Sequence, residues 1–212
     1  MMVRLSQKSE KPMIFSAQSV RAILAGRKTM TRRIVEPQPK IIHAQFPDGS
    51  IETERIFRTG DQRIHPKHPV GSIIWVKETF IKESYPAGPL SSDDRVIITY
   101  RADILDSKPG EWTSPWFMCR SDSRITLDVK AVRVERLQEI TEEDANKEGS
   151  PYYVMGHGPV SIIEMQIEPG FIGQGNYRTG FLDLWDSLNA KRGHPWEANE
   201  LVWVYEFERM KP

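Results

Sequence analysis

Residues 23–33, ILAGRKTMTRR, end a short helical pattern and continue as a run of cationic and hydroxyl side chains. Val20 and Ile23 recur at helical spacing, and Gly26 stands where a helix C-cap is expected. Residues 11–35 contain basic side chains and no acidic one, whereas the whole chain carries 29 basic and 29 acidic residues. This run therefore predicts a local positive patch on a neutral protein, which is a setting suited to an anionic or polar ligand.

With 212 residues, 39% of them hydrophobic and six of them Trp, the chain is long enough for one domain with a substantial core. It has no apolar run that could span a bilayer and no apolar segment typical of a secretory signal. Cys119 is the single cysteine, so an internal disulfide is impossible and a cytoplasmic location is expected. The zero net charge argues against coating of nucleic acid through bulk electrostatics, but it is compatible with a small basic pocket.

The apolar pattern along the chain predicts more strand than helix. The expected elements are a strand at 13–15, a helix from Ser16 to Gly26, strands at 71–80, 95–102 and 125–137, a short helix after Thr141, a helix around 181–188 and a last strand at 201–207. Because the strands are not separated by regular helices, a doubly wound parallel sheet is excluded. The sequence predicts an α+β, mainly β fold: a small mixed or antiparallel barrel with helices at its ends.

The domain organisation follows from where this pattern is interrupted. Residues 1–12 are polar and expected to be flexible, and a single domain is expected over residues 13–209. Three stretches rich in Pro, Gly or Ser interrupt it, and we interpret them as long loop insertions near 36–70, 84–122 and 150–178.

The long strand at 125–137 changes the parity of its apolar residues. Ile125, Leu127 and Val129 share one parity, and Val132 shares the other with Val134. This change predicts a bulge near residues 130–132, or a sharp bend of the kind that closes a small barrel. The following helix has acidic residues in its first turn, which the helix dipole favours, and Gly149 is expected to end it.

Six Trp residues divide into two groups by their expected surroundings. Trp75, Trp185 and Trp203 fall in regular elements and are expected in the core. The loop aromatics at 112–117 are expected to pack back over the body of the protein. The tryptophans that fall in expected loops, any one of which could instead stack on a flipped or single-stranded base, are Trp112, Trp116 and Trp196.

ILAGRKTMTRR resembles the signature of the ASCH family, named for activating signal cointegrator homology, whose members are PUA-like β-barrels. The resemblance continues through GSIIWVKETF at 71–80, ITLDVKAVRVERLQEITEEDANKEG at 125–149 and VWVYEF at 202–207. The segment LWDSLNAKRG at 184–193 is similar to the longer ASCH proteins often carried by phages and prophages. The resemblance covers the body of the chain and says little about the three insertions.

The resemblance implies binding of a nucleic acid or nucleoside, namely RNA or a modified base, in a cleft between the barrel and the signature helix. Some compact members look like amidohydrolases that remove the acetyl group from N4-acetylcytidine with a Lys and a Thr of the signature and a Glu at the end of the acidic helix. The matching positions here are Lys28, Thr31 and Glu148. Other members are associated with ribonuclease activity. This chain departs from the compact members by being roughly twice their size, so its insertions could shape or close the pocket.

The matched residues suit amide hydrolysis chemically. Thr31 could act as the nucleophile if Lys28 accepts its proton, and Glu148 could assist the leaving amine. The ligand-binding residues expected around them are Arg33 and Thr29 in the cleft, with Arg27 and Arg32 at its rim. The ordinary interpretation is that Lys28 and Glu148 form an ion pair between the helix and the barrel, and that Thr31 is a plain strand residue.

The main prediction is therefore a nucleic-acid or nucleoside binding protein, with RNA or a modified nucleoside as partner and no membrane. Two alternatives remain: a hydrolase acting on an N4-acylated cytosine or on the RNA backbone, and a phage accessory module that only contacts proteins through the positive patch. No cofactor and no metal site are expected. His65 and His68 have a spacing that could hold a metal, but no further Cys, His or acidic cluster completes a site.

Overall fold

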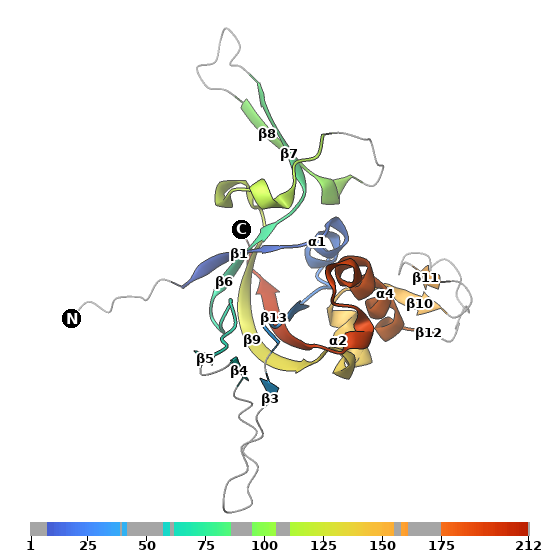
Figure 1. Ribbon diagram of the computed structural model, residues 1–212. Coiled ribbons are helices and arrows are strands. Elements are labelled where there is room, and N and C mark those ends of the chain that lie inside the picture. Colours follow the sequence, from blue (N-terminus) through green and yellow to red (C-terminus); the bar gives the residue numbers. More distant parts are fainter. Residues whose placement is uncertain are drawn as a thin grey trace, which may run out of the picture. The chain divides into compact units, whose positions relative to one another are not determined.

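The computed structural model describes residues 8–38, 40–41, 57–59, 62–85, 95–104, 111–154, 158–160 and 175–211 (Figure 1). Along the chain the elements are β1 (Glu10–Ile14), α1 (Ala17–Leu24), β2 (Met30–Ile34), β3 (Lys40–Ile41), β4 (Phe57–Thr59), β5 (Gln62–Arg63), β6 (Ile73–Lys77), β7 (Phe80–Tyr85), β8 (Arg95–Tyr100), η1 (Arg101–Asp103), η2 (Pro115–Phe117), η3 (Arg120–Asp122), β9 (Thr126–Arg136), η4 (Leu137–Glu139), α2 (Glu142–Lys147), β10 (Tyr152–Val154), β11 (Gly158–Val160), β12 (Gly175–Asn176), α4 (Tyr177–Asn189), η5 (Ala190–Arg192), η6 (Trp196–Ala198) and β13 (Leu201–Arg209). The predicted α+β, mainly β composition is confirmed.

The chain forms two compact units. Unit 1 holds residues 1–29, 71–129 and 207–212, and unit 2 holds residues 30–70 and 130–206. Strands β9 and β13 each contribute residues to both units, so the chain passes between the units inside these strands. The prediction of a single domain over residues 13–209 stays a prediction. None of the described helices is both long enough and apolar enough to cross a membrane.

Unit 1 is built on strands β1, β6 and the first part of β9. Strand β1 pairs in parallel with β6, and β6 pairs antiparallel with β9 from Ile73 opposite Asp128 to Trp75 opposite Thr126. Helix α1 follows β1 and is capped as the sequence predicts, because the Ser16 Oγ accepts a hydrogen bond from the Ser19 N–H at 3.2 Å. Gly26 ends the helix with a positive φ of 73°, a backbone conformation that favours glycine.

The segment at 71–80 is not one strand, which corrects the sequence prediction. Strand β6 ends at Lys77 and β7 begins at Phe80, whose N–H and C=O both bond to Thr113. The break comes at Glu78, whose carboxylate is buried and receives two hydrogen bonds from the Arg124 guanidinium at 2.9 and 3.1 Å. The same guanidinium bonds the exposed Asp103, so Arg124 links the buried Glu78 to the surface at the base of the β7–β8 hairpin (green in Figure 1).

Burial raises the pKa of the Glu78 carboxyl above its ordinary value of about 4.5, and the hydrogen bond and charge of Arg124 offset only part of that effect. A raised folded-state pKa means that the folded protein holds this proton more tightly than the unfolded chain does. The contribution of Glu78 to stability is therefore full below the ordinary pKa and is lost as pH rises through the folded-state pKa.

Substituting Glu78→Gln, which stays neutral, is expected to remove this pH-dependent loss. The variant should gain stability relative to the unmodified protein as pH rises from about 4 to about 7, the range that begins at the ordinary carboxyl pKa. Urea unfolding of both proteins at each pH measures the difference in free energy of unfolding. Glu143→Gln, at a carboxylate whose side chain is 76% exposed, is the control and should leave the difference flat. A flat difference for Glu78→Gln would contradict the assignment.

The loop aromatics of unit 1 are another correction. Trp116 and Phe117 are 72% and 70% exposed, so the prediction that they cover the body of the protein is wrong. The physical reason is the turn η2: Lys77 Nζ donates to the Trp116 carbonyl at 2.5 Å, and it is Met118 that is buried. The direction of the chain at this turn points the apolar Met118 inward and leaves the two larger rings outside.

Unit 2 is built on β2, β13, the rest of β9 and the helices α2 and α4. Strands β2 and β13 pair antiparallel, with Ile34 opposite Val202 and Met30 opposite Glu206. Helices α2 and α4 lie side by side (Figure 1). Unit 2 contains a hydrophobic core cluster to which the strands and the helices both contribute. Its buried residues are Met30, Leu137, Ile140, Ala145, Phe181, Trp185, Val202 and Val204. Burial of such side chains is the main stabilising term of a domain.

The helix boundaries of unit 2 follow the predicted signals. The Thr141 hydroxyl accepts from the Asp144 N–H at 3.1 Å and begins α2, and Gly149, with φ 71°, follows its end. Gly193, with φ 90°, follows η5 after α4. Gly180 serves a different purpose, because a Cβ placed there would lie 2.0 Å from the Pro151 carbonyl oxygen. This glycine permits α4 to approach the chain that follows α2.

Parts of the first and third predicted insertions belong to small sheets. Strands β3, β4 and β5 form one antiparallel sheet within the first insertion, and β10 pairs antiparallel with both β11 and β12 in the third. The predictions for residues 1–7 of the N-terminus, and for residues 39, 42–56, 60–61, 86–94, 105–110, 155–157 and 161–174 of the insertions, lie outside the described residues. In β9 the alternation of buried residues stops after Val129, where the chain passes into unit 2, and the bulge near 130–132 stays a prediction.

Candidate functional site around strand β2 and helix α2

The signature residues fall into both units. Arg27, Lys28 and Thr29 belong to unit 1, directly after α1, where the N–H groups of Arg27 and Lys28 both bond to the Ala22 carbonyl at 2.9 and 3.0 Å. Arg27 and Thr29 are exposed, whereas Lys28 is only 4% exposed. Thr31, Arg32 and Arg33 belong to unit 2, as does Glu148. The catalytic combination of Lys28, Thr31 and Glu148 therefore stays a prediction, and the geometry below concerns unit 2.

The signature continues as a strand, which the sequence pattern did not show. Strand β2 sends successive side chains to opposite faces, so they do not all converge as expected. Thr31 and Arg33 share one face with their β13 partners, Tyr205 and Trp203. Arg32 lies on the other face, which it shares with the hydrophobic core.

Arg32 is buried, although it was expected at the rim of a cleft. Its side chain has no exposed surface, and its guanidinium reaches three carboxylates. The Nε donates to Glu135 Oε1 at 3.0 Å, Nη2 donates to Asp144 Oδ2 at 3.0 Å, and Nη1 donates to Glu148 Oε1 at 3.2 Å. One cation thus joins strand β9 to both ends of α2. Arg32 therefore has a structural role in unit 2: it holds β9 and α2 together through its ion pairs.

Arg133 extends this ion-pair cluster towards solvent. It donates to Glu135 Oε2 at 3.1 Å and to Asp144 Oδ2 at 2.7 Å, and it also pairs with Glu206. The acidic first turn of α2, explained above by the helix dipole, therefore has a second reason. Asp144 binds both Arg32 and Arg133. Buried charges are retained when each is paired and hydrogen-bonded, as Arg32 is here.

Glu148 interacts with arginines on both faces of β2, Arg32 and Arg33. Its carboxylate is 4% exposed and pairs with Arg32, and it also favours the charged form of Arg33. Burial lowers the pKa of the Arg33 guanidinium, and the neighbouring Glu148 and Tyr205 raise it. Thr31 is 3% exposed on the same face as Arg33. This face therefore brings together a buried hydroxyl, a half-buried cation and the field of a buried carboxylate.

The histidines singled out in the sequence separate in the structure. His65 is exposed, whereas His68 is buried with its ring edge-to-face against Tyr205 at 5.7 Å between centroids. Burial raises the pKa of the Tyr205 hydroxyl. Among the residues that the structure describes, no three His, Cys, Asp or Glu side chains are grouped so that they could hold a metal ion.

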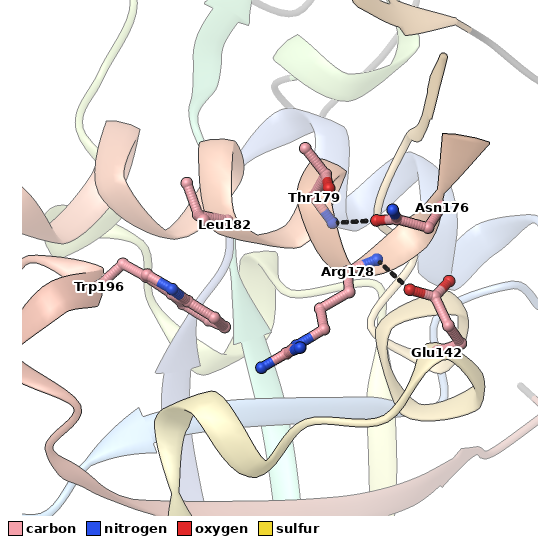
Figure 2. Close-up of a pocket in the computed structure, with 6 residues that line it drawn as sticks. All are labelled: Glu142, Asn176, Arg178, Thr179, Leu182 and Trp196. Atoms are coloured by element: carbon pink, nitrogen blue, oxygen red, sulfur yellow. Dashed lines mark hydrogen bonds between the residues drawn. The ribbon is translucent and has the colours of Figure 1, made fainter. Parts of the chain in front are cut away.

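A polar pocket opens at the other end of α2, and sequence reasoning missed it. Its volume is about 300 Å³, and Figure 2 shows the side chains around it. The lining residues are Glu142, Asn176, Arg178, Thr179, Leu182 and Trp196. Only Trp196 carried a signal, as a loop aromatic that could stack on a base. Glu142 gave none, because an acidic first turn is explained locally by the helix dipole.

We find no match between this chain and any protein-family model, curated protein or solved structure. The resemblance to the ASCH family therefore enters the functional argument as a proposal.

Proposed function

We propose that this chain is an ASCH-type protein with a PUA-like barrel, and that it binds RNA or a modified nucleoside at the face of β2 that carries Thr31 and Arg33. The observation that carries the proposal is the burial of polar groups at this face. Thr31 is 3% exposed, and Glu148, whose charge acts on Arg33, is 4% exposed. Burying such groups costs free energy, and strongly buried titratable groups with specific charge partners are enriched at functional sites.

The chemistry of this face suits a nucleotide. Arg33 supplies a planar guanidinium of the kind that binds phosphate or the acceptor edge of a base. Thr31 supplies a hydroxyl that can donate or accept, and Glu148 supplies an acceptor for an amino group. Arg32 holds the Glu148 carboxylate at 3.2 Å, so this acceptor is fixed in place before a ligand arrives.

The test is a titration of fluorescein-labelled single-stranded RNA, followed by anisotropy at several salt concentrations. Arg33→Gln is expected to weaken binding about tenfold and to lower the salt dependence by about one phosphate contact. Lys191→Gln, which removes an exposed cation of the same unit, is the matched control and should change binding little. Equal losses in both variants would mean that only overall charge matters. No binding by the unmodified protein would reject the proposal and favour a module that contacts proteins.

A second candidate function is hydrolysis of an N4-acylated cytosine. The observation that favours it is the burial within unit 2 of two of the matched residues, with Thr31 at 3% and Glu148 at 4% exposure. In this scheme the Thr31 oxygen attacks the acyl carbon, Lys28 takes the hydroxyl proton, and cytosine leaves as the free amine after protonation; water then hydrolyses the acyl ester. The scheme requires Lys28 and Thr31 within hydrogen-bonding reach.

Turnover separates the two candidates. The protein is incubated with N4-acetylcytidine, and cytidine release is followed by chromatography. A hydrolase should lose turnover in Thr31→Ala while its affinity for the nucleoside stays, and Thr31→Ser should retain part of the activity. A binding protein should release no cytidine and should tolerate Thr31→Ala. Cleavage of the labelled RNA, seen on a gel in the same experiment, would instead indicate a ribonuclease.

A further inference from the structure

We infer that the pocket between α2, α4 and η6 is a binding site for an amino-bearing nucleobase, with Trp196 as the stacking surface and Glu142 and Arg178 as hydrogen-bonding partners. This inference deepens the proposed function, on which it rests for the class of ligand, and it places the base at a second site of unit 2. All six residues of the lining belong to that unit.

The aromatic wall of the pocket is held rigidly. The backbone N–H of Trp196 donates to Asp186 Oδ1 at 2.6 Å, and the backbone carbonyl of Trp196 accepts from Gln138 Nε2 at 3.1 Å. Its ring meets the buried Phe181 ring at 6.1 Å in an edge-to-face contact. A ring that packs against the core and also lines a cavity is preorganised for stacking, because little freedom remains to be lost on binding.

The polar walls are held as well. The Glu142 carboxylate accepts from the N–H groups of Tyr177 and Arg178 at 2.8 and 3.1 Å. The Arg178 guanidinium donates through Nη2 to the Gln138 carbonyl at 2.6 Å and lies 5.9 Å from the centre of the Trp196 ring. Figure 2 shows the Arg178 side chain between Glu142 and Trp196. The pocket thus presents an acceptor, a donor and an aromatic face in one row.

This arrangement selects the ligand class by exclusion. The first N–H groups of α4 already bond to Glu142 and to Asn176 Oδ1, so they offer no site for a phosphate. The Glu142 charge disfavours an anion, and the Arg178 charge disfavours a cation. A purely apolar ligand would leave both groups without partners at a cost in free energy. A planar ring that carries an amino group beside ring acceptors, as cytosine and adenine do, satisfies all three walls.

The remaining lining residues fit the same ligand. Thr179 contributes a hydroxyl and Leu182 an apolar edge. The pocket volume of about 300 Å³ is enough for one nucleoside. It lies at the lower limit of the usual size range for ligand pockets. Stacking between a base and an aromatic side chain, reinforced by a guanidinium, is the usual means by which proteins hold an unpaired base.

Equilibrium dialysis of the full chain against radiolabelled cytidine, adenosine and uridine tests the inference. Cytidine and adenosine should bind about tenfold more tightly than uridine, whose carbonyl would face the Glu142 carboxylate. Arg178→Gln and Trp196→Phe should each weaken cytidine binding about tenfold. Arg178 is exposed, so its variant should fold normally. Lys191→Gln serves as the cation control, and thermal unfolding confirms that each variant is folded.

The outcomes separate this inference from the proposed function. If the folded pocket variants bind cytidine as the unmodified protein does, the pocket is not the base site, whether or not Arg33→Gln weakens RNA binding. Equal affinity for uridine and cytidine would also overturn the inference. If cytidine binding depends on Arg178 and Trp196 but RNA binding is indifferent to Arg33, the pocket stands and the β2 face is rejected. Absence of binding to every nucleoside overturns the inference. The RNA titration with Arg33→Gln then remains as the test of the β2 face.

Discussion

Replacing Arg32 with leucine is expected to lower the free energy of unfolding by about 3–5 kcal/mol at neutral pH, because it removes a fully buried cation that bonds to three carboxylates. Arg32 has no exposed side-chain surface and bonds to Glu135, Asp144 and Glu148. Of these, Glu148 is the most buried, with 4% of its side chain exposed. Taking away one partner of a buried pair costs more than the pair contributes, since the remaining charge keeps its full desolvation penalty.

Urea unfolding of the variant measures this effect, and Lys147→Gln is its matched control. Lys147 pairs with Glu143 at 2.5 Å on the exposed side of the same helix, so its loss should cost less than about 0.5 kcal/mol. A deficit below about 1 kcal/mol would show that Arg32 and its carboxylates do not form the buried ion pairs described.

The ion-pair cluster around Arg32 also explains why the sequence predicted the candidate site only in part. The run RKTMTRR appears as a positive patch because its acidic partners are far away in the chain. Glu135, Asp144 and Glu148 are 103, 112 and 116 residues from Arg32. No local pattern reports such pairing. Part of the same run lies on strand β2, which was considered only in the ordinary interpretation of Thr31, and the alternation of side chains along this strand separates Arg32 from Thr31 and Arg33.

Elements with strong local signals were predicted correctly. Thr141 and Gly149 bound α2, because caps and left-handed glycines act within one turn of the chain. The prediction failed where tertiary contacts decide. Aromatic character placed Trp116 and Phe117 over the core, but both rings are exposed, the next residue, Met118, is buried, and the Trp116 carbonyl accepts a hydrogen bond from Lys77. Such a contact spans 39 residues and leaves no mark on the local sequence.

Phe181→Ala is expected to cost about 3–5 kcal/mol in free energy of unfolding, the usual range for deleting a buried aromatic ring. Phe181 is 3% exposed and its ring lies 6.0 Å from that of Trp185 and 6.1 Å from that of Trp196. The Arg32 guanidinium lies 5.8 Å from the same ring. The cavity left by alanine would therefore open between the core, the ion-pair cluster and the wall of the pocket. Leu188→Ala, on the same helix but 44% exposed, should cost less than about 1 kcal/mol.

Phe181→Ala is also expected to weaken cytidine binding, because Phe181 contacts the Trp196 wall of the pocket. Without its ring, Trp196 loses the contact that supports it from the core, although its backbone bonds to Asp186 and Gln138 remain. Cytidine affinity should then fall in Phe181→Ala under conditions where the variant is still folded, and Phe181→Leu, which refills most of the cavity, should recover stability more than affinity. Full affinity in folded Phe181→Ala would mean that the stacking surface needs no support from the core, and that the rigidity of the pocket comes from the backbone of η6 alone.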